Sequence, residues 1–383
     1  MECRVLSFRK GVCIMQLNCG IVGLPNVGKS TIFSALTSAP AEAANYPFCT
    51  IEPNVGIVHV PDKRLAQITQ YIVPQKIIPA IVEFVDIAGL VKGASKGEGL
   101  GNKFLGHIRQ VGAIVHVVRC FEDDDVVHVE GRVDPESDIE TIRIELAFAD
   151  LETVQKRQDS LVRLKKSADK KISGMAKAAE PVLDLLKEAL EEGIPARLVD
   201  LDERQREMIA DLHLITMKKQ LYCCNVGDDE LEADNDHVKK VRAFAERDGS
   251  GVVVISGKLE SEISDLDSAE EKAEFLEAAG LEESGLDKLI RKGYDMLGLN
   301  TYFTAGEKEV RAWTFPNGAR APQAAGIIHT DFEHGFIRAE TYHCTDLFEY
   351  KTEQKLKENG KMRVEGKEYV VADGDVLHFR FNV

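Results

Sequence analysis

Eight consecutive residues near the start of the chain have the pattern of a phosphate-binding loop. Residues 23–30 read Gly-Leu-Pro-Asn-Val-Gly-Lys-Ser, which fits glycine, any four residues, glycine, lysine and then serine or threonine. The glycines allow backbone N–H groups to surround a phosphate, and a helix that starts at the lysine points the positive end of its dipole at the same place. We expect Lys29 to bind the β- and γ-phosphates and Ser30 to bind Mg2+. Asn26, Val27, Gly28 and Thr31 complete the predicted nucleotide contacts of this loop.

Two further motifs occur where a phosphate loop needs partners. Asp86 ends an apolar run and is followed by Ile-Ala-Gly, so its carboxylate can hold Mg2+ while the N–H of Gly89 bonds the γ-phosphate. Thr50 lies in a loop between the first predicted helix and the next strand, where a hydroxyl can reach the metal of a bound triphosphate. The sequence therefore predicts Ser30, Thr50 and Asp86 as metal ligands, and Lys29, Thr50 and Gly89 as catalytic residues.

The residue after Gly89 favours slow hydrolysis. Ras-like enzymes have a glutamine there that orients the attacking water, whereas this chain has Leu90, which cannot hydrogen-bond to water. A histidine could replace the glutamine, and His128 is the preferred catalytic candidate because it follows three consecutive aspartates in a predicted loop. The other candidates are His107 and His116, of which His116 lies in an apolar strand and is expected to be structural.

Short apolar runs alternate with helical segments and would position these motifs. Two of the runs, 81–85 and 114–118, are rich in β-branched residues, and their alternation with helical or glycine-rich segments favours a parallel sheet covered by helices. The predicted strands are 17–22, 81–85, 114–118, 220–225 and 251–255. Between residues 139 and 211 the chain is dense in Glu, Lys, Leu and Arg, which predicts two long helices in an antiparallel hairpin. Apolar residues recur there at helical spacing, namely Leu151, Val154, Leu161 and Leu164. The tip of the hairpin is expected within 167–174.

The last part of the chain has a different pattern. After a helical stretch at 260–297, four runs are candidate strands of a small β-rich module, namely 310–314, 325–329, 368–371 and 376–381. Two places could bring positive charge to RNA or another partner. They are the hairpin tip, with Arg163, Lys165, Lys166, Lys170 and Lys171, and the end module, with Arg311, Arg320 and Arg338.

Composition and charge limit the classes of function. The chain has 383 residues, of which 44% are hydrophobic and 29% charged, as is typical of a globular protein of two or three domains. Lys plus Arg total 48 against 64 for Asp plus Glu, and this net charge of −16 excludes a broadly basic protein that coats nucleic acid. No apolar run approaches the ~20 residues that span a bilayer, so no membrane partner is expected.

Cysteine usage and the leading residues bear on location. The eight cysteines are scattered and show no Cys-x-x-Cys spacing, which predicts reduced thiols and a cytoplasmic protein. The first sixteen residues contain three basic residues but no signal-peptide cleavage pattern follows them. We interpret residues 1–15 as an N-terminal extension ahead of an alternative start at Met15.

Together these motifs resemble the Obg-like ATPase (YchF) family of translation-factor-type P-loop G-domain NTPases. The segments 45–51 and 86–102, which read Asn-Tyr-Pro-Phe-Cys-Thr-Ile and Asp-Ile-Ala-Gly-Leu onward to Gly-Glu-Gly-Leu-Gly-Asn, look like the family's two switch segments. The resemblance covers residues 15–383. It implies an α/β fold, with a Rossmann-like P-loop NTPase G domain, an inserted antiparallel helical hairpin and a C-terminal β-grasp (TGS) domain. It also implies binding of ATP in preference to GTP and association with the ribosome or ribosomal RNA, and no DNA partner is expected.

The resemblance gives domain bounds and a function. The predicted domains are an extension at 1–15, a nucleotide-binding G domain at 16–138 and 212–300, a helical (coiled-coil) insert at 139–211 and a TGS domain at 301–383. The predicted function is a Mg2+-dependent ATPase that cleaves the β–γ phosphoanhydride bond and acts as a slow switch in translation or stress regulation. Two alternatives are a GTPase of the same architecture and a nucleotide-organised adaptor whose hydrolysis is incidental. Asn26 resembles the asparagine that binds K+ in potassium-stimulated relatives, and the alternative is a turn-forming asparagine.

The purine is expected to bind after strand 220–225. Guanine-specific relatives carry Asn-Lys-x-Asp, whose aspartate accepts hydrogen bonds from the ring N–H and amino group of guanine. This chain has Asn-Val-Gly-Asp at 225–228. Val226 in place of lysine favours ATP, whereas Asp228, where the family usually has glutamate, leaves GTP open. We expect Asn225 to contact the base edge, the backbone of Val226 to discriminate the exocyclic group, and Asp228 and Ser256 to complete the base side.

Overall fold

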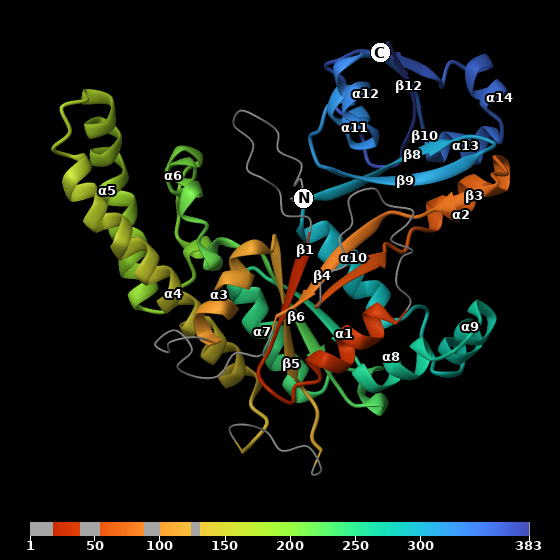
Figure 1. Ribbon diagram of the computed structural model, residues 1–383. Helices are drawn as coiled ribbons and strands as arrows, with labels where there is room; N and C mark the ends of the chain where they lie inside the picture. The colour runs from red at the N-terminus through yellow and green to blue at the C-terminus, as the bar shows by residue number, and fades with distance from the viewer. Residues whose placement is uncertain (1–17, 39–53, 88–99, 124–130, 383) are drawn as a thin grey trace. The chain divides into compact units, whose positions relative to one another are not determined.

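The computed structural model describes residues 18–38, 54–87, 100–123 and 131–382 (Figure 1). Within these ranges the chain divides into two compact units. The first comprises residues 18–38, 54–56, 83–87, 100–123 and 131–289, and the second comprises residues 57–82 and 290–382. No helix in the described ranges has the length and apolar composition needed to cross a bilayer.

A six-stranded sheet in the order β2-β4-β1-β5-β6-β7 lies at the centre of the nucleotide-binding fold. Strand β1 (Asn18–Val22) pairs in parallel with both β4 (Ile81–Asp86) and β5 (Ala113–Arg119). Parallel pairing continues from β5 to β6 (Gln220–Asn225) and then to β7 (Gly251–Ile255), while β2 (Val55–His59) lies next to β4. The predicted strands agree with these bounds within one residue, and the predicted parallel sheet is confirmed.

Helices cover both faces of this sheet. Figure 1 shows α1 and α8 on one face, and α3 and α7 on the other. The helical stretch predicted at 260–297 is divided among α8, α9 and α10. The helices of this part of the chain are α1 (Lys29–Thr37), α3 (Leu100–Gln110), α7 (Asp236–Asp248), α8 (Gly257–Ser264), α9 (Ala269–Ala278) and α10 (Gly285–Met296).

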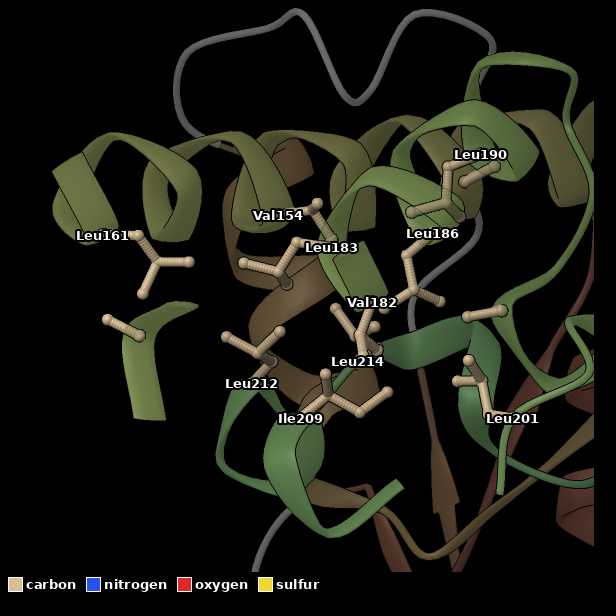
Figure 2. Close-up of a cluster of buried hydrophobic side chains, with 13 residues drawn as sticks. Val154, Leu161, Val182, Leu183, Leu186, Leu190, Leu201, Ile209, Leu212 and Leu214 are labelled. Atoms are coloured by element: carbon tan, nitrogen blue, oxygen red, sulfur yellow. The ribbon is translucent and has the colours of Figure 1, made fainter. Parts of the chain in front are cut away.

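Two long helices form the predicted antiparallel hairpin, α4 (Pro135–Leu164) and α5 (Lys170–Glu191). Buried aliphatic side chains join the hairpin to the segment after it, which contains α6 (Glu203–Ile209) (Figure 2). Of the predicted core positions, Val154 and Leu161 are buried, but Leu164 is 41% exposed because α4 ends there. The labelled members of this hairpin core are Val154, Leu161, Val182, Leu183, Leu186, Leu190, Leu201, Ile209, Leu212 and Leu214.

The second unit contains a mixed sheet in the order β11-β10-β12-β8-β9-β3. The first and last strands of the C-terminal segment, β8 and β12, are parallel neighbours. On its other side β8 pairs antiparallel with β9, and β12 pairs antiparallel with β10. This first-beside-last arrangement is that of a β-grasp module, as predicted. The strands are β3 (Lys76–Ile78), β8 (Leu299–Ala305), β9 (Glu309–Pro316), β10 (Phe336–His343), β11 (Arg363–Glu365) and β12 (Asp375–Phe381), and the helices are α2 (Lys63–Tyr71), α11 (Ala321–Ile328), α12 (Thr330–His334), α13 (Cys344–Tyr350) and α14 (Glu353–Glu358).

Two of the predicted strands in this module are wrong. Residues 325–328 belong to helix α11, because Pro322 suits a first helical turn and the neighbouring alanines are the strongest helix formers. Residues 368–371 contain only an isolated bridge, between Val370 and Arg320. The predictions at 310–314 and 376–381 are confirmed by β9 and β12.

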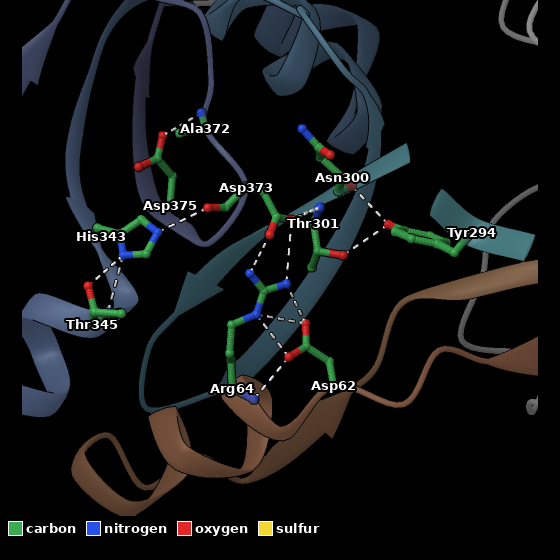
Figure 3. A network of polar contacts seen from close by, with 10 residues as sticks. All are labelled: Asp62, Arg64, Tyr294, Asn300, Thr301, His343, Thr345, Ala372, Asp373 and Asp375. Carbon is green, nitrogen blue, oxygen red and sulfur yellow. Dashed lines mark hydrogen bonds and ion pairs between the residues drawn. The ribbon is translucent and has the colours of Figure 1, made fainter. Parts of the chain in front are cut away.

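Residues 57–82 were assigned from sequence to the nucleotide-binding domain, but they pack within the second unit. Strand β3 extends the mixed sheet by pairing in parallel with β9. Arg64 of α2 donates to Asp62 and to Asp373, and Asp373 also accepts the N–H of Thr301 at 2.8 Å (Figure 3). Burial lowers the pKa of Arg64, but its bonds to the two carboxylates outweigh this and raise the pKa above its usual range.

A leucine pair tests the hairpin core. Leu186 is fully buried, whereas its neighbour Leu185 is 46% exposed. We expect Leu186→Ala to lower the free energy of unfolding by about 2–5 kcal/mol, because it leaves a cavity, and Leu185→Ala to change it by less than about 1 kcal/mol. Denaturant unfolding followed by circular dichroism measures both, and equal effects would contradict this core.

An arginine pair tests the attachment of residues 57–82. Arg64→Ala removes both carboxylate contacts and should lower stability by roughly 1–2 kcal/mol, with faster amide hydrogen exchange in α2 and β3. Arg320→Ala is the control, because its ion pair with Glu368 lies on the surface, where such pairs contribute little. If exchange in α2 and β3 is unchanged in Arg64→Ala, the network does not hold this segment.

Candidate nucleotide-binding site

The phosphate-binding loop joins β1 to α1, as the pattern requires. Gly28 is the N-cap residue of α1. Its φ of 90° lies in the left-handed region, which residues other than glycine rarely adopt. A Cβ atom on Gly28 would also lie 2.1 Å from Nδ2 of Asn225. Asn26 has a φ of 63°, and the side chains of Asn26, Ser30 and Thr31 are exposed. The three polar side chains of the predicted loop contacts are therefore accessible to a ligand.

Lys29 and Asp86 are brought together across neighbouring strands. The ammonium group of Lys29, which is 9% exposed, donates to the Asp86 carboxylate. Strand pairing explains this contact, because Asp86 of β4 lies opposite Ile21 of β1, just before the loop. The N–H of Asp86 donates to the carbonyl of Asn54 at 2.8 Å, which fixes the end of β4. The predicted phosphate-binding cation and the predicted metal-binding carboxylate are thus adjacent.

Asn225 links the phosphate loop to the predicted base-binding loops. Its Nδ2 donates to the carbonyl of Val27 at 3.0 Å, and its Oδ1 accepts the N–H of Gly257 at 2.9 Å. Asn225 is only 5% exposed, and Val27 is buried beside it. Both ends of the amide are therefore bonded within the protein, and its contact with a base stays a prediction.

The carboxylate of Asp228 is held by the loop that follows β7. Ser256 Oγ donates to one oxygen, and Lys258 Nζ lies 2.9 Å from the other. Partial burial raises the pKa of Asp228, but the hydrogen bonds from Ser256 and Lys258 outweigh it, and the net pKa lies below the usual value. Asp228 is therefore a charged acceptor at neutral pH, with 36% of its side chain exposed.

Several predicted residues have other neighbours or lie outside the described ranges. Val226 is buried and its N–H donates to the carbonyl of Ile255 at 2.9 Å, so this N–H is already bonded within the protein. His116 is buried beside Gln220, as expected of a structural histidine, and burial lowers its pKa to about 3. Thr50, Gly89 and His128 fall outside the described residues, and their roles stay predictions.

Two contributors were not predicted from sequence. Lys258 pairs with Asp228. The sequence signal that could have indicated this contact is its position two residues after Ser256, in the segment that follows β7. Asn54 supports Asp86 through a backbone carbonyl, which carries no side-chain signal at all. Its φ of 72° is an unusual conformation that asparagine tolerates better than most residues.

Paired asparagine substitutions test the link at Asn225. Asn225→Ala should weaken nucleotide binding at least tenfold, because the phosphate loop and the loop at Gly257 lose their common anchor. Asn235 is a matched control with two hydrogen bonds of its own, to the carbonyl of Cys120 and from the N–H of Val238. Both variants should lose about 1–3 kcal/mol of stability, and calorimetric titration should show lost affinity for Asn225→Ala alone. Equal affinities would exclude this role for Asn225.

Comparison with known proteins gives matches to both parts of the chain. A family model described as "50S ribosome-binding GTPase" matches residues 18–161, and the YchF-GTPase C-terminal model, described as a protein of unknown function, matches residues 299–382. The "Ribosome-binding ATPase YchF" of Bacillus subtilis (strain 168) is 57% identical over 371 residues, which cover 96% of this chain and 100% of that protein. The protein of the same name from Escherichia coli O157:H7 is 54% identical over 369 residues, with the same coverage.

A solved structure agrees with these sequence matches. The Schizosaccharomyces pombe YchF GTPase has a TM-score of 0.87 and 40% sequence identity, over 97% of this chain and 99% of that one. The similarity therefore includes the phosphate loop, the helical hairpin and the β-grasp module together. With these identities over its length, this chain belongs to the YchF family.

Proposed function

We propose that this chain is a cytoplasmic, Mg2+-dependent ATPase that binds the ribosome and acts as a slow nucleotide switch in translation or stress regulation. The observation that carries the proposal is the convergence of Lys29, Asp86 and Asn225 on the phosphate loop, at the carboxyl ends of parallel strands. Such edges are where ligands bind in open α/β sheets. The name of the bacterial relatives, ribosome-binding ATPase, supports the choice of partner and nucleotide.

The chain's own residues supply positioning and positive charge. Transfer of a phosphoryl group to water depends mainly on these two effects. The N–H groups of residues 23–30 and the N-terminal end of α1 provide partial positive charge, and Lys29 provides a full one. Because Lys29 bonds Asp86 in the structure, triphosphate binding would replace this carboxylate with phosphate oxygens and leave Asp86 available to the metal.

Oxygen atoms of the kind that Mg2+ prefers lie next to Lys29. Ser30 is exposed in the first turn of α1, and Asp86 ends the neighbouring strand. The described residues contain no cluster of three or more His, Cys, Asp or Glu that could bind a metal alone. Mg2+ is usually held by one or two protein groups together with phosphates and water. When bound, Mg2+ would neutralise phosphate charge, and Thr50 would be a further ligand. Gly89 and His128 are the other proposed catalytic residues.

The proposed preference for ATP rests on the missing lysine of the guanine motif and on the relatives' name. Asp228 favours the alternative, GTP, because its charged carboxylate could accept the paired N–H groups of guanine. The description of the fission yeast relative as a GTPase keeps this alternative open.

Parallel titration with ATP and GTP tests the nucleotide. Binding and hydrolysis should be measured with Mg2+, and with K+ or Na+ as the monovalent ion. We expect ATP to bind more tightly than GTP and to be hydrolysed slowly. If Asn26 binds K+, hydrolysis should be faster in K+ than in Na+. Tenfold tighter binding of GTP would overturn the ATP proposal, and equal rates in K+ and Na+ would remove the role of Asn26.

One lysine variant separates a switch from an adaptor. The adaptor hypothesis is motivated by Leu90, which cannot orient water. Lys29→Ala should abolish hydrolysis and also change the nucleotide dependence of ribosome co-sedimentation, whereas Lys239→Ala, an exposed lysine of α7, should change neither. If Lys29→Ala loses hydrolysis but binds ribosomes as before in every nucleotide state, the adaptor hypothesis is correct and the switch is not.

A further inference from the structure

The tip of the helical hairpin, defined here as residues 160–179, has a charge opposite to that of the whole chain. It contains one arginine, five lysines and one aspartate, so its net charge is 6 − 1 = +5. The chain carries −16, and the remainder therefore carries −16 − 5 = −21. The net charge of the remainder therefore repels a polyanion, whereas that of the hairpin tip attracts one.

Most of this positive charge is not neutralised within the protein. Lys165 pairs with Glu180 of α5. The other five cations are exposed and have no ion-pair partner in the part of the chain that the structure describes; they are Arg163, Lys166, Lys170, Lys171 and Lys177. The only acidic residue of the tip, Asp169, accepts the N–H groups of Lys171 and Ile172 at the start of α5.

The tip is held in shape before any partner arrives. Ser173 Oγ donates to the carbonyl of Lys165 at 2.8 Å, which joins the start of α5 to the end of α4. The hairpin core, with Leu161 as its outermost labelled member, fixes the two helices below the tip (Figure 2). At 1.5 Å per residue, the 30 residues of α4 place the tip roughly 45 Å along the helix from Pro135. Little ordering of the backbone would be needed on binding.

The composition of the tip favours RNA over a protein partner. Lysine is depleted in protein–protein interfaces, whereas it readily neutralises phosphates and releases their counterions. The three basic candidates of the end module are less suited, because Arg311 stacks on Trp313 at 3.8 Å, Arg320 is paired with Glu368, and the exposed Arg338 is then a single cation. Exposed aliphatic side chains at the tip are the feature that favours a protein instead; they are Val162, Leu164, Ile172 and Met175.

We propose that the hairpin tip is an RNA-binding surface, which holds the phosphate backbone of ribosomal RNA through Arg163 and the exposed lysines without reading base sequence. This inference rests on the proposed ribosome binding and names the surface that performs it. Because phosphate contacts dominate, the affinity should fall steeply with salt.

A triple lysine variant tests the proposal in the full-length protein. Lys166→Gln, Lys170→Gln and Lys171→Gln together remove three charges from exposed positions of the tip. Lys156→Gln, Lys239→Gln and Lys240→Gln remove three exposed lysines elsewhere and form the matched control. Binding to purified ribosomes and to protein-free ribosomal RNA should be measured over a series of salt concentrations. We expect the tip variant to bind both ribosomes and RNA at least tenfold more weakly than the unsubstituted protein. The slope of its log affinity against log salt should be less steep by about 2–3. The control should bind as the unsubstituted protein does.

The remaining outcomes separate the possible failures. A tip variant that binds like the control overturns the proposal. The proposal is also overturned if the double variant Ile172→Ser and Met175→Ser loses ribosome binding while the lysine variant keeps it. That result would indicate a protein partner at the tip. If the unsubstituted protein binds neither probe, the proposed ribosome function fails with it. Unchanged ATP hydrolysis by the tip variant shows that its nucleotide site is intact.

Discussion

The ion pair between Lys29 and Asp86 is the interaction on which the nucleotide site depends. It forms because β1 and β4 are parallel neighbours in a register that sets Ile21 opposite Asp86, so that the residues after both strands meet at one edge of the sheet. Lys29 is 9% exposed, and a buried ammonium without a partner would cost several kcal/mol. A triphosphate offers Lys29 the same kind of partner. In the proposed function, exchange of carboxylate for phosphate at Lys29 would be the step at which ligand binding rearranges the end of β4.

A second contact joins the phosphate loop to the predicted base side. Asn225 fixes the phosphate loop to the loop after β7, so the phosphate side and the predicted base side keep a constant relation. Residues 57–82 lie in sequence between the two predicted switch segments, yet they pack within the second unit through Arg64 and β3. The boundary between the units falls within β4, the strand that ends at Asp86.

Local sequence patterns predicted the sheet and the phosphate loop, because both are encoded in short stretches. The strands 220–225 and 251–255 were predicted at their observed bounds, since each is a short apolar run with polar or glycine residues at its ends. Residues 325–328 were misread as a strand because the proline and alanines that start α11 lie just before them. Leu164 fits the helical spacing but is exposed, because periodicity does not show where the opposing helix ends.

Contacts between distant residues could not be predicted in the same way. No local feature of Asn225 indicates that its amide bonds Val27, which lies 198 residues earlier in the chain. The packing of residues 57–82 in the second unit likewise depends on Arg64 meeting Asp373, which lies 309 residues later. Family resemblance supplied the order of the domains, but the structure was needed to find these links.

A crystal structure of the protein with Mg2+ and a non-hydrolysable ATP analogue would test this exchange of partners at Lys29. We expect the analogue to occupy the loop of residues 23–30, Lys29 Nζ to leave Asp86 for the phosphates, and Asn225 to keep both of its hydrogen bonds. A nucleotide bound elsewhere, or one bound at this loop while Lys29 still pairs with Asp86, would contradict it.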